Sequence, residues 1–487
     1  MAEDNGKIVN RVDRSRLKRI HLLGIAGTGM GSFAGMLKEA GYEVSGSDEK
    51  VYPPMSDMLQ AWNIPVLTPY SPENLDRTKP NLAIIGNVIR RENPEAAEVR
   101  ARRIPQMSFP SALGWLFLRS RHPIVIAGTH GKTTVSAMMG HVLVAARRDP
   151  SFLVGGVTRN YDANYRLGRG AHFVIEGDEY DTAYFDKGPK FLHYLPRTAV
   201  LTSIELDHAD IYRDLRHYET AFDAFVNLVP RNGTIAVCAA YPNAVRIARS
   251  ARGKVVTYAT QRGHGVDFAA ANISFSKDGT RFSVLEANFP LGEILLPMGG
   301  VHNVENALGV IAAARALGLS FDEIAGGLST FGGVKRRQEE RGEIDGVMVI
   351  DDFAHHPTAV RETIAAVHGR YPERRLWAVF EPRSNTSRRN IHQREYAQSF
   401  AGADRASVKI PEPHDKVPTD EQLDVPALIE SLKAQGIAAD SADSIDGLVA
   451  RIAQESRAGD LILVMSNGSF GGLINKVIGE LRKGTRE

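Results

Sequence analysis

The sequence is poor in cysteine: Cys238 is the one cysteine among 487 residues. An internal disulfide and a metal cluster held by cysteines are therefore excluded. The chain also has no apolar run near the roughly 18 residues that a membrane span requires, and its first residues lack the apolar stretch of a signal peptide. The net charge is only +2, so charge gives no reason to expect a nucleic-acid-binding surface. We expect a cytoplasmic protein that binds neither membranes nor nucleic acid.

What the chain does have is an alternation of strand-like apolar runs and helical patterns along its whole length. This alternation predicts α/β domains with parallel sheets. A passage rich in arginine at residues 119–123 and a glycine-containing passage at 331–334 are candidate boundaries. We predict three domains: a Rossmann-like N-terminal domain at 18–122, a central P-loop ATPase-type domain at 123–333 and a Rossmann-like C-terminal domain at 334–487.

The strongest chemical motif is a glycine loop that follows an apolar run at residues 124–127 and precedes a helical pattern. A strand, a tight loop and a helix N-terminus in this order cradle phosphate, because backbone N–H groups and the positive helix end face the anion. The loop lysine adds a charge, and a threonine hydroxyl reaches Mg²⁺. Ile126 stands where the usual spacing has glycine. The motif predicts binding of a nucleoside triphosphate by Gly128, Thr129, His130, Gly131, Lys132, Thr133 and Thr134.

A second glycine-rich turn follows the apolar run at residues 19–23 and extends from Gly24 to Gly31. The next strand-like run, at 42–48, ends in Asp48, whose carboxylate could bind a ribose or a base. The turn resembles the first turn of a nucleotide-binding domain. Its glycine spacing is not that of a dinucleotide site, and packing of a helix on a strand explains the glycines equally well.

Two strand-like runs downstream of the P-loop end in acidic residues. The run at 172–175 is followed by Glu176, Asp178 and Glu179, and the run at 199–204 is followed by an Asp-His-x-Asp element at 207–210. Mg²⁺ prefers hard oxygen donors, and a strand end beside a P-loop is where such a ligand belongs. For any one of these acids, a solvated strand end is the alternative interpretation.

The sequence is similar to the Mur ligases, a family that is ATP-dependent and builds the peptide of peptidoglycan. Five motifs occur in the family's order and spacing: Gly-Thr-His-Gly-Lys-Thr-Thr at 128–134, Asp-His-x-Asp at 207–210, His-Asn-x-x-Asn at 302–306, Arg-Arg at 336–337 and Asp-Asp-x-x-His-His-Pro at 351–357. The resemblance spans nearly the whole chain. It also accounts for Ile126, because the family's loop lacks the early glycine.

The resemblance implies roles for individual residues. UDP-sugar binding is expected at Gly27, Thr28, Gly29, Met30, Ser47 and Asp48. ATP contacts beyond the P-loop are expected at His302, Asn303, Asn306 and Arg337, with Arg336 as the second choice for the γ-phosphate. Mg²⁺ is expected at Thr133, Thr134, Glu176 and His208. The catalytic residues are expected to be Lys132, His208, Arg337, Asp352, His355 and His356, the last three helping the C-terminal domain to close over ATP and the amine.

The element at 351–357 resembles the two family members that act directly on UDP-N-acetylmuramate. One adds L-alanine, and the other adds the tripeptide L-alanyl-γ-D-glutamyl-meso-diaminopimelate during peptidoglycan recycling. The segments at 179–187, 207–212, 380–386 and 465–472 favour the tripeptide-adding member. A tripeptide brings several carboxylates, so its pocket needs a cation and amide donors. We predict that these are Arg383, Ser384 and Asn385, although an exposed loop arginine is the plainer interpretation.

The predicted reaction joins a carboxylate to an amine through an acyl phosphate, and a monomer or a weak homodimer is expected. Three alternatives stay open. The chain could be the L-alanine-adding ligase. A nicotinamide-dependent dehydrogenase would explain the turn at 24–31 but leaves Lys132 without a role. A P-loop switch or a transport ATPase would explain Lys132 but not the third α/β domain with its His-His-Pro element.

Overall fold

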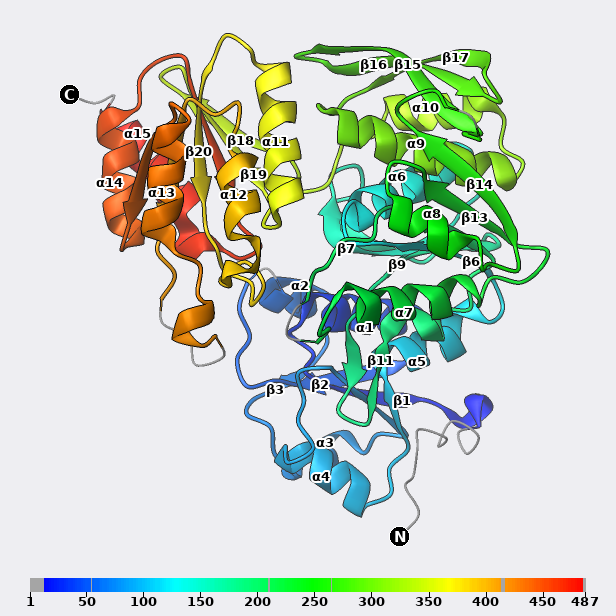
Figure 1. Ribbon diagram of the computed structural model, residues 1–487. Coiled ribbons are helices and arrows are strands. Elements are labelled where there is room, and N and C mark those ends of the chain that lie inside the picture. Colours follow the sequence, from blue (N-terminus) through cyan, green and yellow to red (C-terminus); the bar gives the residue numbers. More distant parts are fainter. Residues whose placement is uncertain (1–12, 54, 209–210, 264, 413–416, 485–487) are drawn as a thin grey trace. The chain divides into compact units, whose positions relative to one another are not determined.

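A computed structural model describes residues 13–53, 55–208, 211–263, 265–412 and 417–484. The chain folds into two compact units (Figure 1). The first unit comprises Met1–Ile204, Arg216–Thr257 and Gly309–Gly327, and the second comprises Glu205–Leu215, Tyr258–Leu308 and Leu328–Glu487.

The first unit begins with a five-stranded parallel sheet in the order β3-β2-β1-β4-β5. Its strands are β1 (Arg19–Leu23), β2 (Glu43–Ser47), β3 (Val66–Leu67), β4 (Leu82–Ile85) and β5 (Gln106–Ser108). Its helices are α1 (Thr28–Glu39), α2 (Met55–Ala61), α3 (Glu73–Thr78), α4 (Pro94–Ala101) and α5 (Phe109–Leu113). The strand order reverses between β1 and β4, which is where open α/β sheets bind ligands.

The first unit also holds the sheet of the P-loop, in the order β13-β12-β6-β9-β7-β8. Neighbouring strands of this sheet run parallel, except that β7 and β8 are antiparallel. The strands are β6 (His122–Ala127), β7 (Ser151–Thr158), β8 (Ala163–Arg166), β9 (His172–Gly177), β12 (Thr198–Leu201) and β13 (Thr234–Cys238). The associated helices are α6 (Lys132–Ala145), α7 (Leu215–Val226) and α8 (Pro242–Ala248), and β10 (Asp181–Ala183) forms a hairpin with β11 (Asp186–Pro189). β6 is almost continuously apolar because a parallel strand is covered on both faces.

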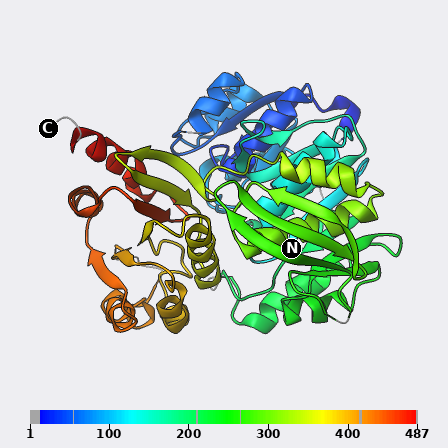
Figure 2. The same cartoon turned by 90° about the horizontal axis from the view of Figure 1, so that it is seen from above.

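β14 (Lys254–Ala259) crosses from the first unit into the second, where its end pairs with β15. β15 (Phe268–Ser276), β16 (Gly279–Glu286) and β17 (Phe289–Leu296) form an antiparallel meander, visible as long adjacent strands in Figure 2. α9 (Val301–Ala316) and α10 (Phe321–Ser329) follow. The meander is absent from the sequence-based prediction of parallel sheets, so that prediction is incomplete here.

The C-terminal part of the second unit is a six-stranded sheet in the order β18-β19-β23-β20-β21-β22. Its strands are β18 (Glu339–Ile344), β19 (Val347–Asp352), β20 (Arg375–Phe380), β21 (Arg405–Lys409), β22 (Ala438–Ala442) and β23 (Asp460–Met465). Its helices are α11 (Pro357–Arg370), α12 (Gln393–Ser399), α13 (Val425–Ala434), α14 (Ile445–Glu455) and α15 (Leu473–Gly484).

Two hydrophobic clusters cover the two faces of this sheet. Along β20, Leu376 and Phe380 belong to the cluster with α11, α12 and α13, whereas Trp377 and Val379 belong to the cluster with α14 and α15. Successive side chains of a strand point to opposite faces, so the alternation shows helices on both sides of the sheet, as in Figure 1. The prediction of an α/β fold is confirmed. The exact domain limits at 122/123 and 333/334 stay predictions.

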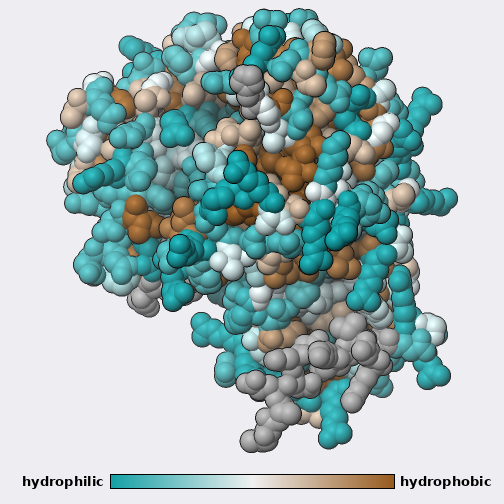
Figure 3. Space-filling model, turned by 45° about the vertical axis from the view of Figure 1, so that its right-hand side comes forward, coloured by the Kyte–Doolittle hydropathy of each residue, from teal (hydrophilic) through white to brown (hydrophobic). Residues whose placement is uncertain are grey.

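The surface in Figure 3 is mainly hydrophilic, with separate hydrophobic areas. Large exposed hydrophobic residues are scattered along the sequence; Phe289, Val88 and Tyr52 are the most exposed of them. Among the described residues, no helix combines the length and the apolar character needed to span a membrane.

Candidate active site

The P-loop connects β6 to α6 and is held by the end of β12. Two glycines take backbone conformations that side chains rarely adopt, with φ of +139° at Gly128 and +78° at Gly131. A Cβ at Gly128 would lie 2.1 Å from Thr202 Oγ1, so the close approach also requires glycine. The Thr202 hydroxyl donates to the His130 carbonyl at 2.6 Å, and the His130 N–H donates to Ser203 Oγ at 2.9 Å. The loop therefore has the fixed, open backbone that a phosphate cradle needs.

Lys132 is the first residue of α6, and its side chain is held inside the loop. Its Nζ donates to the Gly128 carbonyl at 2.6 Å and lies 3.0 and 3.1 Å from the two carboxylate oxygens of Glu179. Burial alone would lower the pKa of Lys132, but the charges of Glu179, Asp178 and Glu176 outweigh it and raise the pKa above its usual value. Lys132 is therefore a charged group at neutral pH, held against the backbone of the loop.

Glu176, in β9, faces the first turn of α6. Its Oε2 accepts a hydrogen bond from the Thr133 hydroxyl at 3.1 Å, and its Oε1 accepts one from the Gly155 N–H at 2.5 Å. A hydroxyl and a carboxylate side by side at a P-loop are a hard-oxygen donor set that fits Mg²⁺. The Thr134 side chain is buried, so Thr133 is the better placed of the two predicted threonines.

The Asp-His-x-Asp element belongs to the second unit, and its residues 209 and 210 lie outside the described residues. Asp207 is buried; its Oδ1 accepts a bond from the His208 N–H at 2.7 Å, and its Oδ2 lies 4.0 Å from His355 Nε2. Burial would raise the pKa of Asp207, but the charges of His208, His355 and His356 hold it well below the usual range. Asp207 is thus an anion surrounded by histidines. His208 has the left-handed backbone φ of +53°, which gives its side chain an unusual direction.

The start of α9 and the start of the C-terminal sheet are linked by Gln338. Its backbone N–H donates to Asp352 Oδ2 at 2.8 Å, and its side-chain Nε2 lies 3.3 Å from both His302 Nε2 and the Gly299 carbonyl. Asn303 is buried and donates to the Gly299 carbonyl at 2.8 Å, and Asn306 donates to Asn303 Oδ1 at 3.2 Å. The ATP contacts predicted at His302, Asn303 and Asn306 therefore belong to one hydrogen-bonded group.

The predicted Asp352, His355 and His356 lie where β19 turns into α11. Asp352 is buried, and its oxygens also accept bonds from the Ala354 N–H and the Thr363 hydroxyl. His356 is the N-cap of α11 and accepts a bond from the Thr358 N–H at 3.3 Å. Asp352 and His356 thus shape this turn, whereas His355 is more exposed. Their catalytic roles stay predictions.

The structure distinguishes the two neighbouring arginines. Arg336 donates to the carbonyls of Ser466 and Gly468 at 2.7 and 2.5 Å, so its guanidinium fixes the loop after β23. The guanidinium carbon of Arg337 lies 4.7 Å from the centre of the Phe353 ring, a cation–π contact. The hydrogen bonds of Arg336 give it a structural role, and the assignment of Arg337 to the γ-phosphate stays a prediction.

The turn predicted to bind the UDP-sugar lies between β1 and α1, at the carboxyl ends of the first sheet. Gly27 is the N-cap of α1, followed by Thr28, Gly29 and the buried Met30. Asp48 braces the turn, because its Oδ2 accepts a bond from the Ala26 N–H at 2.8 Å. The turn before the helix is thereby fixed, and its contact with the UDP-sugar stays a prediction.

Glu95, on α4, lies behind this turn and is fully buried. Its Oε1 lies 2.7 Å from His21 Nε2 and accepts a bond from the Ser47 hydroxyl at 3.0 Å. Its Oε2 accepts bonds from the Ser71 N–H at 3.1 Å and from Asn74 Nδ2 at 2.9 Å. Burial would raise the pKa of Glu95, but the partners, His21 first, lower it below the usual value. The Ser47 hydroxyl is therefore engaged with Glu95, and its predicted contact with the ligand stays untested.

Replacing Glu95 with alanine should destabilise the first sheet by about 3–5 kcal/mol, because it leaves buried polar partners without their acceptor. Since the folded pKa of Glu95 is lowered, its contribution is present at neutral pH and is lost as pH falls below 4.5 through the folded value. Hydrogen exchange of the β1 amides measures both effects. Glu98→Ala, at a surface pair with Arg102 on the same helix, should cost about 1 kcal/mol or less. Equal protection in the two variants would contradict a structural role for Glu95.

The predicted peptide loop follows β20. Arg383 is exposed, and its guanidinium packs over Gly468, where a Cβ would lie 1.7 Å from Nη1. The Ser384 hydroxyl bonds Ser387 Oγ at 2.9 Å and accepts the Ser387 N–H at 3.0 Å, so it stabilises the turn. Arg383 thus presents its charge at the surface of a well-defined loop, with Asn385 beside it.

Three family descriptions match successive parts of the chain. They are "Mur ligase family, catalytic domain" at residues 19–121, "Mur ligase middle domain" at 126–314 and "Mur ligase, glutamate ligase domain" at 336–468. The chain belongs to the Mur ligase family. It is therefore an enzyme, an ATP-dependent ligase that forms a carbon–nitrogen bond, with the family's three-domain α/β fold.

Two relatives and one solved structure are similar over most of this Mur ligase. A UDP-N-acetylmuramate–L-alanyl-γ-D-glutamyl-meso-2,6-diaminoheptandioate ligase of Escherichia coli (strain K12) is 38% identical, covering 96% of this chain and 98% of that protein. A UDP-N-acetylmuramate–L-alanine ligase of Salinibacter ruber is also 38% identical but covers 80% and 79%. The crystal structure of a murein peptide ligase from Psychrobacter arcticus 273-4 matches with a TM-score of 0.70 at 34% identity, covering 95% and 98%.

Sequence reasoning missed the contacts by which three residues of this ligase hold its predicted site residues. Glu179 is buried and binds Lys132, and the Tyr218 hydroxyl donates to Glu179 Oε1 at 3.0 Å. Gln338 joins His302 to Asp352. Glu179 was among the acidic residues expected beside the P-loop, but as a possible Mg²⁺ ligand and not as the partner of Lys132. Nothing in the local sequence marks Tyr218 or Gln338. Tyr218 contacts Glu179, which lies 39 residues away, and Gln338 contacts His302, which lies 36 residues away.

Proposed function

We propose that this ligase joins UDP-N-acetylmuramate to the tripeptide L-alanyl-γ-D-glutamyl-meso-diaminopimelate, as a step of peptidoglycan recycling. The observation that carries the proposal is the similarity to the Escherichia coli tripeptide ligase across nearly the full length of both proteins. The match to the L-alanine ligase of Salinibacter ruber has the same identity but leaves about a fifth of each chain uncovered. The exposed Arg383 loop supports the proposal, because a peptide with several carboxylates needs a cation there.

The chemistry requires activation, because a carboxylate and an amine do not condense in water at neutral pH. The muramoyl carboxylate attacks the γ-phosphorus of ATP, which releases ADP and gives an acyl phosphate. The free amine of the tripeptide adds to the acyl carbon, loses a proton, and the tetrahedral adduct expels phosphate. Positioning and charge neutralisation are what an enzyme contributes to such steps.

The residues fit these tasks. Lys132 offsets charge on the ATP phosphates, and Arg337 binds the γ-phosphate. Thr133 and Glu176, with His208 as a further ligand, would hold Mg²⁺, which when bound offsets phosphate charge. His302 and Asn303 contact the adenine, Asn306 belongs to the same ATP site, and the turn at Gly27–Met30 with Asp48 binds the UDP-sugar. We also propose that the enzyme works in the bacterial cytoplasm as a monomer or a weak homodimer.

The proposal is tested by supplying UDP-N-acetylmuramate, ATP and either the tripeptide or L-alanine, and measuring phosphate release and product mass. The tripeptide should be the much better substrate, because a single small residue cannot occupy a tripeptide site. Arg383→Ala should raise the KM for the tripeptide by about 30-fold or more, as expected for a lost charge-assisted contact. The KM values for ATP and UDP-N-acetylmuramate should change little.

Arg361→Ala serves as the matched control, since Arg361 is an exposed arginine of the same unit on α11. It should leave all three KM values unchanged. Faster ligation of L-alanine than of the tripeptide by the unaltered enzyme would make this the L-alanine-adding ligase instead. A tripeptide KM that is insensitive to Arg383→Ala would remove Arg383 from the peptide site.

A further inference from the structure

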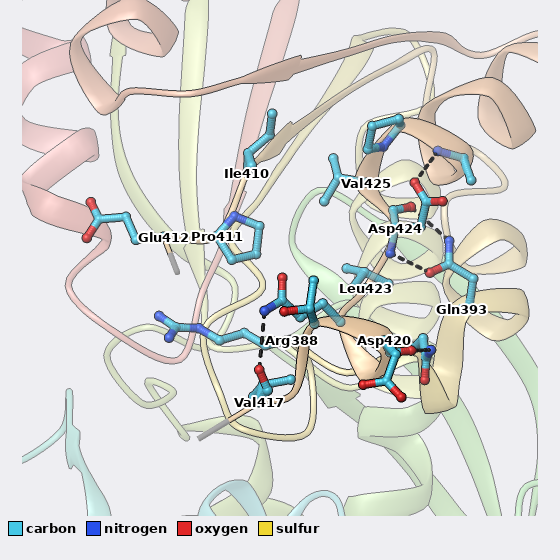
Figure 4. Close-up of a pocket in the computed structure, with 15 residues that line it drawn as sticks. Arg388, Gln393, Ile410, Pro411, Glu412, Val417, Asp420, Leu423, Asp424 and Val425 are labelled. Carbon is cyan, nitrogen blue, oxygen red and sulfur yellow. Dashed lines mark hydrogen bonds between the residues drawn. The ribbon is translucent and has the colours of Figure 1, made fainter. Parts of the chain in front are cut away.

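Two places outside the candidate active site hold polar side chains that the proposed reaction does not use. One is a cavity of about 690 Å³ in the C-terminal part of the second unit (Figure 4). Its charged groups do not meet at one point, because Figure 4 shows Glu412 and Asp420 on opposite sides of Arg388. The other place is the contact between α1 and the β7–β8 hairpin, which both belong to the first unit. There the polar side chains do meet.

Asn164, in β8, is fully buried and reaches from the hairpin to α1. Its side-chain Nδ2 donates to Ser32 Oγ at 2.5 Å, and the Ser32 hydroxyl donates to the Thr28 carbonyl at 2.7 Å. Ser32 is also completely buried, and Thr28 is the first residue of α1. Thr28 belongs to the turn proposed for the UDP-sugar, so two consecutive hydrogen bonds connect that turn to the sheet of the P-loop.

The same side of α1 comes close to the hairpin one turn further on, at Gly35. A Cβ at Gly35 would lie 2.7 Å from the Tyr165 hydroxyl oxygen and 2.9 Å from Cζ3 of Trp62. The rings of Tyr165 and Trp62 pack edge to face, with their centres 5.4 Å apart. Residues three apart lie on one side of a helix. This side of α1 therefore rests on β8 through close packing at Gly35 and through a hydrogen bond at Ser32.

The hairpin also contacts the acid proposed to hold Mg²⁺. The Gly155 N–H, in β7, donates to Glu176 Oε1 at 2.5 Å. One hairpin is therefore bonded to the carboxylate beside the P-loop through β7 and to the helix of the UDP-sugar turn through β8.

Stability alone does not account for an amide at position 164. The Oδ1 atom of Asn164 is enclosed and has no hydrogen-bond partner among the described residues. A buried acceptor without a partner destabilises a fold, so such a group calls for an explanation. An apolar side chain of similar size would avoid this cost, but it would lose the bond to Ser32. The amide is therefore explained by that bond and not by packing.

We infer that Asn164 is a positioning residue for the acyl-phosphate step: through Ser32 it holds the UDP-sugar turn in place relative to the P-loop. The inference rests on the proposed function and assigns a role to a residue outside the proposed binding residues. The muramoyl carboxylate must reach the γ-phosphorus in line, and a displacement of about 1 Å at such a step lowers the rate on the order of 100-fold. Loss of the link leaves the residues of each binding site intact, so it lowers kcat and not affinity.

The test measures kcat and KM of Asn164→Ala with UDP-N-acetylmuramate, ATP and the tripeptide. The kcat should fall by about 10- to 100-fold, whereas the KM for ATP and the Kd for UDP-N-acetylmuramate should change by less than about 3-fold. Ser32→Ala removes the other partner of the same bond and should lower kcat by a similar factor. The double variant should be no slower than Ser32→Ala, because the two changes break one link.

Ser151→Ala is the matched control, since Ser151 is a fully buried polar residue of the same hairpin whose hydroxyl bonds to the backbone of Gly168 and not to α1. It should retain kcat although it also removes buried hydrogen bonds. Calorimetric titration with UDP-N-acetylmuramate gives the fraction of binding-competent protein, so that kcat is expressed per competent molecule. If Asn164→Ala folds poorly, Ser32→Ala still tests the link.

Three results overturn the inference while the proposed function stands. They are a normal kcat in Asn164→Ala or Ser32→Ala, an equal loss of kcat in Ser151→Ala, and a double variant whose loss is the product of the two single losses. An unaltered enzyme that does not join UDP-N-acetylmuramate to the tripeptide overturns both.

Discussion

Replacing Lys132 with alanine should abolish ATP-dependent ligation, with a fall in kcat of at least about 100- to 1,000-fold. The ammonium group is held at the centre of the loop by the Gly128 carbonyl and Glu179, and it stays charged because Glu179 raises its pKa. No other described lysine lies within the loop at residues 128–134. Without it, charge that develops on the phosphates during transfer has no cation from α6 to offset it.

Binding of the UDP-sugar should survive the same change, because its proposed residues belong to the turn between β1 and α1. Fluorescence or calorimetric titration with UDP-N-acetylmuramate measures this separately from turnover. Lys254→Ala, at an exposed lysine of β14, is a matched control that should keep full activity. Retention of even about a tenth of the normal rate by Lys132→Ala would contradict a role in phosphate transfer.

Glu179 also explains why Lys132 stays charged inside the loop. A buried lysine needs a partner, and Glu179 supplies one that the Tyr218 hydroxyl orients. The acid beside the P-loop is therefore a positioning residue for Lys132.

The sequence predicted those parts of the fold in which the determining interactions are local. The P-loop was predictable because strand, glycines and helix follow one another within residues 122–145, and the structure has β6 and α6 there. The apolar run that became β20 was equally plain, since all but its first residue are buried. Parallel strands that are covered on both faces are almost continuously apolar, so they can be recognised in the sequence whatever their order in the sheet.

Interactions between distant residues were not predictable in this way. Glu95 lies 74 positions from His21 and 48 from Ser47, and a single glutamate on a helix gives no sign that it will be buried. The antiparallel strands β15–β17 alternate polar and apolar residues near glycine turns, a weaker pattern than the buried parallel strands around them. Asp352 was predicted as catalytic from its motif. Its oxygens accept hydrogen bonds from Gln338, Ala354 and Thr363, and a sequence pattern cannot distinguish such a structural role from a catalytic one.

Replacing Glu176 with glutamine should lower kcat on the order of 100-fold and raise the Mg²⁺ concentration needed for half-maximal activity by a similar factor. The change keeps the size of the side chain but removes the charge beside the Thr133 hydroxyl. It also brings an amide N–H₂ toward either the Thr133 hydroxyl or the Gly155 N–H, both of which now donate to the carboxylate. The proposed metal would thus lose its anionic ligand, and the Thr133 hydroxyl would lose the carboxylate that positions it.

The measurement is a Mg²⁺ titration of ligation at saturating ATP, with UDP-N-acetylmuramate binding as the check on folding. Asp181→Asn is the matched control, because Asp181 is an acid of the same unit that pairs with Lys187 and does not contact Thr133. Its Mg²⁺ dependence should equal that of the unaltered enzyme, since a partly exposed ion pair contributes little. If Glu176→Gln lowers the rate without shifting the Mg²⁺ midpoint, then Glu176 acts by holding Thr133 and the Gly155 backbone in place. The metal would then be held by other ligands, and His208 would be the next residue to substitute.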